Sequence, residues 1–88
     1  MSEPTNAQRA DWARDALDVF GRAVFHQSAD EMIATGRGDR DGDLACAISD
    51  LICDLMHLAD QHGLDAYNVY GAALTNYEAE VEEAAEDA

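Results

Sequence analysis

Five large aliphatic residues in the middle of the chain recur at intervals of four, three, four and three residues. They are Leu44, Ile48, Leu51, Leu55 and Leu58. This spacing brings all five side chains to one face of an α-helix, whereas a strand would alternate its apolar and polar residues. The stripe therefore predicts a helix over residues 44–62, which Gly63 ends as the residue after the C-cap.

Two helices are predicted before this stripe. Residues 6–27 have the apolar spacing of a long amphipathic helix, which begins with a capping box at Thr5 and Gln8. A second capping box at Ser28 and Glu31 opens a short helix over residues 29–35. The sequence GRGDRDGD that follows has the composition of a loop.

One further helix is predicted after the stripe, over residues 66–84, with Asp65 as its N-cap. The short connection HGLD makes it the second arm of an antiparallel helical hairpin. Its apolar residues are expected to be buried: Ala66, Tyr70, Ala73, Tyr77, Val81 and Ala84. The acidic tail EAEVEEAAEDA at residues 78–88 is expected to fray, with residues 85–88 beyond the helix, because acids are unfavourable at a helix C-terminus. The chain is thus predicted to be one all-α domain (1–88), a small helical bundle of three long helices and one short helix.

Acidic residues far outnumber basic ones, and the imbalance is concentrated in the second half of the chain. There are 19 acids and 5 basic residues, all arginine, which gives a net charge of -14. Residues 1–40 carry seven acids and all five arginines, whereas residues 41–88 carry twelve acids and no base. Direct binding to nucleic acid or to an anionic membrane is not expected, because phosphate contacts need Lys and Arg. A basic protein surface is the partner that this charge favours, and a charge that serves only solubility is the alternative.

The stretch DRDGDLACAISD at residues 39–50 resembles the start of a calcium-binding loop, with Asp39, Asp41 and Asp43 at its first, third and fifth positions. Such a loop has Gly at its sixth position and a bidentate Glu at its twelfth. Here these positions hold Leu44 and Asp50. Because the helix that begins near Leu44 needs the same backbone, we interpret Asp43 as a helix N-cap rather than as a calcium ligand.

A strip of polar residues lies beside the apolar stripe, with Asp50, Asp54 and His57 at positions i, i+4 and i+7. This arrangement could bind a divalent ion or contact a partner, although such a strip is more often simply a solvated helix face. The sequence contains no nucleophile arrangement, phosphate-binding glycine loop or paired-carboxylate motif. We therefore assign no catalytic residue, metal ligand or cofactor.

Cys46, Cys53 and Met56 lie roughly opposite the apolar stripe on the same predicted helix. A helix with apolar residues on two sides is typical of a central helix or of a subunit interface, and these three residues are the predicted interface of a possible homodimer. The two cysteines are seven residues apart, about 10.5 Å along a helix, which is too far for a disulfide within the chain. With no signal peptide or membrane-spanning run apparent, cytoplasmic localisation is the default expectation.

Residues 41–80 resemble small helical proteins of phages and other mobile elements. The parts that carry the resemblance are Ile48-Ser49-Asp50-Leu51, Asp54-Leu55-Met56-His57, Gly63-Leu64-Asp65 and Tyr77-Glu78. The resemblance implies an accessory protein of a mobile element. Small acidic proteins of that origin include anti-CRISPR and anti-restriction inhibitors, some of which mimic DNA, and the likeness to these is one of size and charge.

A second resemblance is to the all-α nucleotide pyrophosphohydrolases, which hold magnesium with an ExxE motif followed by an ExxD motif. This chain departs from that pattern, because no ExxE precedes Asp50 and the spacing from Asp50 to Asp54 differs. Glu80 and Glu83 have the spacing of ExxE but come after that pair.

The leading hypothesis from the sequence is a non-enzymatic acidic interaction protein that blocks a basic, nucleic-acid-binding surface of a host protein. The residues expected to bind this partner are Asp50, Asp54, Asp60, Glu78, Glu82 and Glu83. The alternative is a divalent-metal-dependent dimer similar to the nucleotide pyrophosphohydrolases, built around Asp50, Asp54 and His57.

Overall fold

The computed structural model describes residues 4–35 and 43–87. The chain forms α1 (Asn6–Val24), α2 (Ala29–Thr35), α3 (Asp43–Gln61) and α4 (Ala66–Asp87), and no strand occurs within these described ranges. The all-α prediction of three long helices and one short helix is confirmed.

The helix starts follow from the capping residues that the sequence contains. At α1 the Gln8 backbone N–H donates to Thr5 Oγ1 at 3.1 Å, and the Thr5 N–H donates to Gln8 Oε1 at 2.8 Å. At α2 the Glu31 N–H donates to Ser28 Oγ at 3.1 Å. Both predicted capping boxes are therefore formed, and each satisfies backbone donors that a helix start leaves without partners.

The connection between α3 and α4 is equally well specified by its sequence. Gly63 has a φ of 74°, a left-handed conformation that favours glycine. The Leu64 N–H donates to the Ala59 carbonyl at 3.0 Å and the Gly63 N–H to the Asp60 carbonyl at 3.2 Å, which is a Schellman motif. Asp65 Oδ1 then accepts a hydrogen bond from the N–H of Tyr67 at 2.9 Å and caps α4.

Two helix ends differ from the predicted ones. Helix α1 ends at Val24, three residues early, because His26 takes a left-handed φ of 58° and the Gln27 N–H turns back to the Gly21 carbonyl at 3.2 Å. Helix α4 continues to Asp87, so the expectation that the tail at residues 78–88 frays was wrong for its described part. Alanine and glutamate dominate this tail, and their helix propensity outweighs the unfavourable dipole.

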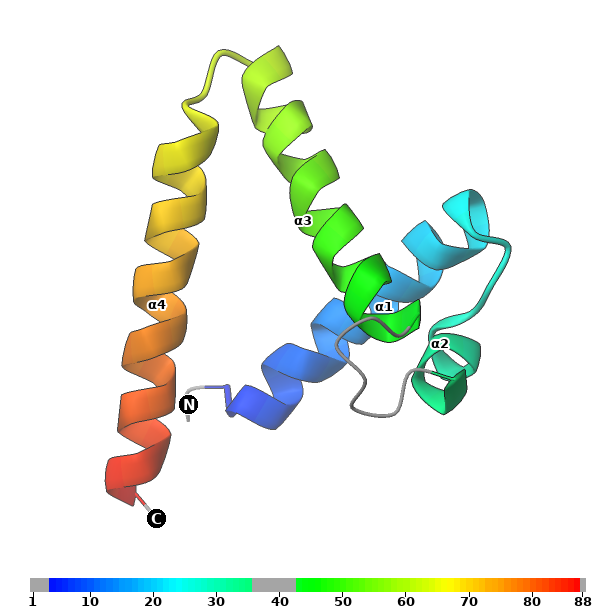
Figure 1. The fold of residues 1–88 in the computed structure, drawn as a ribbon. Helices are drawn as coiled ribbons and strands as arrows, with labels where there is room; N and C mark the ends of the chain where they lie inside the picture. The colour runs from blue at the N-terminus through cyan, green and yellow to red at the C-terminus, as the bar shows by residue number, and fades with distance from the viewer. Residues whose placement is uncertain (1–3, 36–42, 88) are drawn as a thin grey trace.

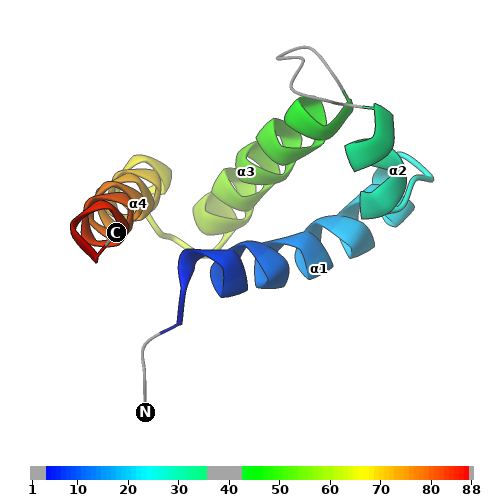
Figure 2. The same ribbon diagram turned by 90° about the horizontal axis from the view of Figure 1, so that it is seen from below.

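The helices are arranged as an open triangle rather than as parallel rods. Helices α3 and α4 diverge from their connecting turn as an antiparallel hairpin, and α1 runs across the open end (Figure 1). Viewed from below, α4 stands apart from α3, while α2 lies at the opposite side against the end of α1 (Figure 2). Arg9 Nε near the start of α1 reaches Glu80 Oε2 of α4 at 3.2 Å and holds the corner between these helices.

The hydrophobic core lies where α1, α2 and the first half of α3 meet. Leu17, Met32 and Ala47 are buried there, and the half-buried side chains of Phe20, Leu44 and Leu51 pack around them. Outside this cluster, the other buried apolar residues among those described are all alanines: Ala29, Ala59 and Ala66.

The predicted burial of the α4 stripe was wrong for all of its members except Ala66. Tyr70, Ala73, Tyr77, Val81 and Ala84 are exposed. The α3 stripe is also only partly covered, because Ile48, Leu55 and Leu58 are exposed. The physical reason is the divergence of α3 and α4, which carries the two stripes apart beyond the turn (Figure 1).

Asp18 joins α1 to α2 by accepting two hydrogen bonds at 2.8 Å, from the Ala29 backbone N–H and from Arg22 Nε. The Ala29 hydrogen bond, followed by the Arg22 guanidinium, lowers the pKa of Asp18 below its ordinary value of 3.8. A lowered folded-state pKa contributes stability that is present above the unfolded pKa and lost as the pH falls through the folded one.

We therefore expect Asp18→Asn to be less stable than the parent near neutral pH. The difference in free energy of unfolding should shrink as the pH falls below 3.8, where the parent carboxylate also loses its charge. Urea unfolding of the parent and of Asp18→Asn, from neutral pH to below 3.8, measures this difference. Asp15→Asn, an exposed site on the same helix, is the control and should show no such convergence. A difference that persists unchanged at low pH would contradict the role given to the Asp18 charge.

Candidate functional site

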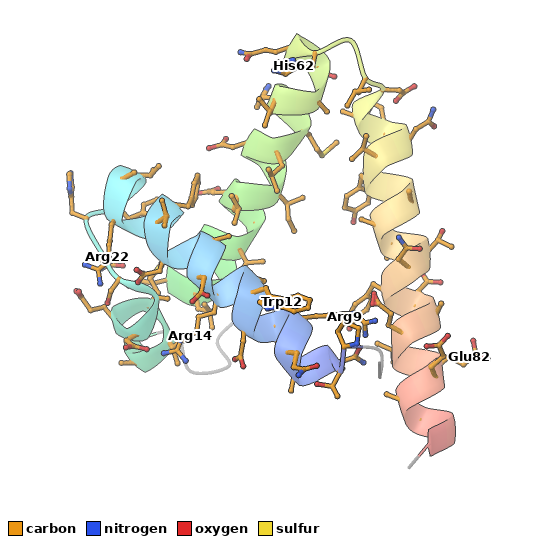
Figure 3. All side chains as sticks on the ribbon, turned by 180° about the vertical axis from the view of Figure 1, so that it is seen from behind. Arg9, Trp12, Arg14, Arg22, His62 and Glu82 are labelled. Carbon is orange, nitrogen blue, oxygen red and sulfur yellow. The ribbon has the colours of Figure 1, made fainter. Side chains whose placement is uncertain are left out.

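The six predicted partner-binding carboxylates are all exposed, and they lie on two helices. On α3, Asp50 and Asp54 are one turn apart and share a strip, and Asp60 lies roughly 120° around the helix from Asp54. On α4, Glu78 and Glu82 are one turn apart, with Glu83 the next residue around. Glu82 points away from α1 and α3 (Figure 3). We call these six residues the acidic surface.

The arginines that the structure describes are engaged with other acids. Arg22 pairs with Asp18 at 2.8 Å, and Arg14 pairs with Asp30, so both neutralise acids of α1 and α2. Arg9 pairs with Glu80, the one acid of α3 or α4 that an arginine reaches among the described residues. Figure 3 shows Arg14 and Arg22 at the α2 end of α1 and Arg9 beside α4. Arg37 and Arg40 lie outside the described residues.

The consequence is a surface with uncompensated negative charge. Within residues 4–35 and 43–87, no Arg or His nitrogen lies within 4.0 Å of any of the six carboxylates of the acidic surface. Two pairs, Asp50 with Asp54 and Glu78 with Glu82, place like charges one helical turn apart, and each such pair destabilises its helix by about 0.2–0.5 kcal/mol. A cationic partner would relieve this repulsion.

The Arg9–Glu80 ion pair was not predicted from the sequence. Its partners are 71 residues apart, and α1 and α4 carry no local pattern that joins them. The Asn6 side-chain amide adds a hydrogen bond to the Glu80 carbonyl at 3.2 Å. Both contacts attach the second half of α4 to the start of α1, so they position the acidic residues that flank Glu80.

The metal-binding alternative receives no support from the geometry. The described part of the chain contains no group of three or more His, Cys, Asp or Glu side chains close enough to hold a metal ion. Asp50, Asp54 and His57 therefore do not converge with a further ligand. Asp39 and Asp41 of the calcium-loop resemblance lie outside the described residues. Asp43 to Asp50 are helical, where a calcium loop would still be irregular, and the helix begins at Asp43 itself.

Cys46 and Cys53 are exposed and form no disulfide among the described residues, and Met56 is half-buried. Cys53 and Met56 line a shallow groove at the α3–α4 turn together with His57, Asp60 and Tyr67. Among the described residues no hydrogen bond joins Cys53 to His57. The homodimer interface predicted at Cys46, Cys53 and Met56 stays a prediction.

A second polar groove, which the sequence did not single out, runs between α1 and α2. Its charged lining residues are Asp11, Arg14, Asp15, Asp18, Arg22 and Asp30. Both arginines form ion pairs within the groove, so its charges are largely satisfied internally. The acidic surface of α3 and α4 is thus the larger source of uncompensated charge.

Across the described helices, none has the length and apolar character needed to cross a membrane. Comparisons with protein-family models, with curated proteins and with solved structures gave no match. The function therefore has to be inferred from the surface chemistry of this chain.

Proposed function

We propose that this chain is a non-enzymatic interaction protein, whose acidic surface binds and blocks a basic, nucleic-acid-binding surface of another protein. The observation that supports the proposal most is the separation of charge in the structure. The described arginines are all in α1, and none of them lies within 4.0 Å of the six carboxylates of the acidic surface. Exposed charge of one sign accelerates association with an oppositely charged surface and selects against like-charged partners.

The class of partner follows from the same charge. A groove that binds nucleic acid is lined with Lys and Arg, and exposed carboxylates can take the place of phosphates there. We further propose a phage or mobile-element origin, which rests on the resemblance of residues 41–80 described above, and an anti-CRISPR or anti-restriction role, which rests on likeness in size and charge alone. Partners of this kind work in the cytoplasm, and the chain is proposed to act there.

The proposal predicts partner binding that depends steeply on salt. The tagged chain would be used to capture proteins from a lysate of the host cell at low and at high salt, with identification by mass spectrometry. We expect a nucleic-acid-binding protein that is recovered only at low salt, because screening weakens contacts between exposed charges. Recovery that is equally strong at high salt would count against the proposal.

A pair of matched double variants tests which carboxylates carry the binding. Glu78→Gln with Glu82→Gln removes two exposed acids one turn apart on α4. Asp11→Asn with Asp15→Asn removes an equivalent exposed pair on α1 and is the control. At about 0.2–1 kcal/mol for each exposed contact, we expect a 2- to 30-fold loss of affinity for the first variant. An equal loss for the control would show that only net charge matters and would contradict a defined acidic surface.

A further inference from the structure

Most of the α4 stripe and the second half of the α3 stripe are open to solvent. Six large side chains on these helices are between 43% and 64% exposed: Leu55, Leu58, Tyr70, Leu74, Tyr77 and Val81. We call them the open apolar face. Trp12, 59% exposed, lies on the part of α1 that crosses between α3 and α4 (Figure 3). An apolar surface this extensive on a small chain is typical of an interaction site.

The total exposed area is larger than that of a compact monomer of this mass. A folded monomer of 9.5 kDa is expected to expose about 5,000 Å², whereas this chain exposes 6898 Å². Counting all eleven residues outside the described ranges as unfolded chain would account for about 1,100 Å² of the difference. About 800 Å² of excess exposed area then remains, which equals the area that one partner buries in an interface of standard size. The excess before this subtraction matches the area that each copy buries in an obligate homodimer.

The radius of gyration and the small number of large buried side chains are consistent with this large exposed area. The radius of gyration is 14.6 Å, against about 12 Å for a compact chain of 88 residues. Within the described residues, Leu17 and Met32 are the only buried apolar side chains larger than alanine. Their burial contributes about 1.5–3 kcal/mol each, and chains this small commonly complete such a core by oligomerisation.

The uncharged side chains of the open apolar face favour a second copy of this chain, rather than a basic protein, as the partner that packs there. The six side chains of the open apolar face carry no charge, and the residues flanking them on both helices include acids and no Lys or Arg. A basic partner would be drawn to those acids rather than to the apolar side chains between them. A like-charged copy can approach only through an uncharged surface, and a two-fold axis makes one apolar face complementary to itself.

We propose that a second copy of this chain packs on the open apolar face, so that the α3 and α4 stripes of two copies form one shared core. This interface lies on the opposite side of α3 from Cys46 and Cys53 and replaces the face that the sequence suggested. The dimer goes beyond the proposed function and does not depend on it, because the carboxylates of the acidic surface lie outside the six interface side chains.

Sedimentation velocity of the parent protein over about a hundredfold range of concentration tests the dimer directly. We expect a mass of twice 9.5 kDa at high concentration and a thermal unfolding midpoint that rises with concentration. A mass of 9.5 kDa and a constant midpoint throughout would overturn the proposal.

Three single variants then locate the interface. Leu74→Glu, at a side chain 43% exposed, is expected to give a monomer, whereas its matched control Ile33→Glu on α2, 41% exposed, should remain a dimer. Cys53→Glu should also remain a dimer. A monomer with Cys53→Glu and a dimer with Leu74→Glu would place the interface on the opposite side of α3 and overturn the proposal.

Nitration of tyrosine in the parent protein tests the same interface without a variant, so it still applies if Leu74→Glu does not fold. Tyr77 is 64% exposed in a single copy, so its nitration should be fast in dilute protein and at least several-fold slower at high concentration. N-acetyltyrosine amide in the same solution is the reference for reagent activity. Nitration of Tyr77 that is equally fast at both concentrations would overturn the proposal.

Discussion

Replacing Met32 with alanine is expected to lower the free energy of unfolding by about 2–5 kcal/mol. Met32 has no exposed surface and lies between Leu17 of α1 and Ala47 of α3, so its removal leaves a cavity at the junction of three helices. Because the buried core holds few large side chains, little else can fill that cavity. Urea unfolding of parent and variant at one fixed protein concentration measures the loss.

The control is the next residue of the same helix. Ile33 is 41% exposed, so Ile33→Ala removes a side chain of similar size without opening a buried cavity and should lower the free energy of unfolding by about 1 kcal/mol or less. An equal decrease in the free energy of unfolding for Met32→Ala and Ile33→Ala would mean that the junction of α1, α2 and α3 does not contribute most of the stability.

The helices could be predicted from the sequence because their ends are specified locally. The capping boxes at Thr5 and Ser28 and the helix stop at Gly63 depend on hydrogen bonds between residues at most five positions apart. Such contacts form in any surroundings that allow a helix. The exception is the end of α1 at His26, where a residue other than glycine takes the left-handed conformation that the sequence pattern reserves for Gly or Asn.

Burial could not be predicted in the same way. Helical periodicity shows that Tyr70, Tyr77 and Val81 share one face, but it does not show what covers that face. Covering depends on the angle between α3 and α4, which is set by contacts far apart in the sequence, such as Arg9 with Glu80. The α4 stripe was therefore placed correctly on one helix face, and its predicted burial was wrong.

The acidic surface and the open apolar face have a physical relation. Repulsion between two copies that each carry a net charge of -14 opposes association, and it is weakest when the acids of each copy face away from the contact. Glu82 has this orientation, because it points away from α1 and α3 (Figure 3). A dimer through the apolar stripes would thus double the outward negative charge available to a basic partner.

Replacing Gly21 with alanine is expected to lower the free energy of unfolding by about 1–3 kcal/mol through overpacking. Gly21 is buried in α1, and an added Cβ would stand 2.7 Å from the Gln27 carbonyl oxygen and would overlap the Met32 methyl group. The Met32 side chain is itself fully buried, and the Gln27 carbonyl belongs to the backbone that ends α1. Neither neighbour can move without disturbing the core.

The same substitution at Gly71 is expected to raise the free energy of unfolding rather than to lower it. A Cβ at Gly71 meets no atom within 4 Å, so Gly71→Ala should raise the free energy of unfolding by about 0.8–1 kcal/mol through helix propensity alone. Urea unfolding of both variants at one protein concentration measures the contrast, and stabilisation at Gly21 would contradict the packing of α2 on α1. Gly71 lies outside the six residues of the open apolar face. A lower free energy of unfolding for Gly71→Ala would therefore mean that the second copy approaches α4 from a different side.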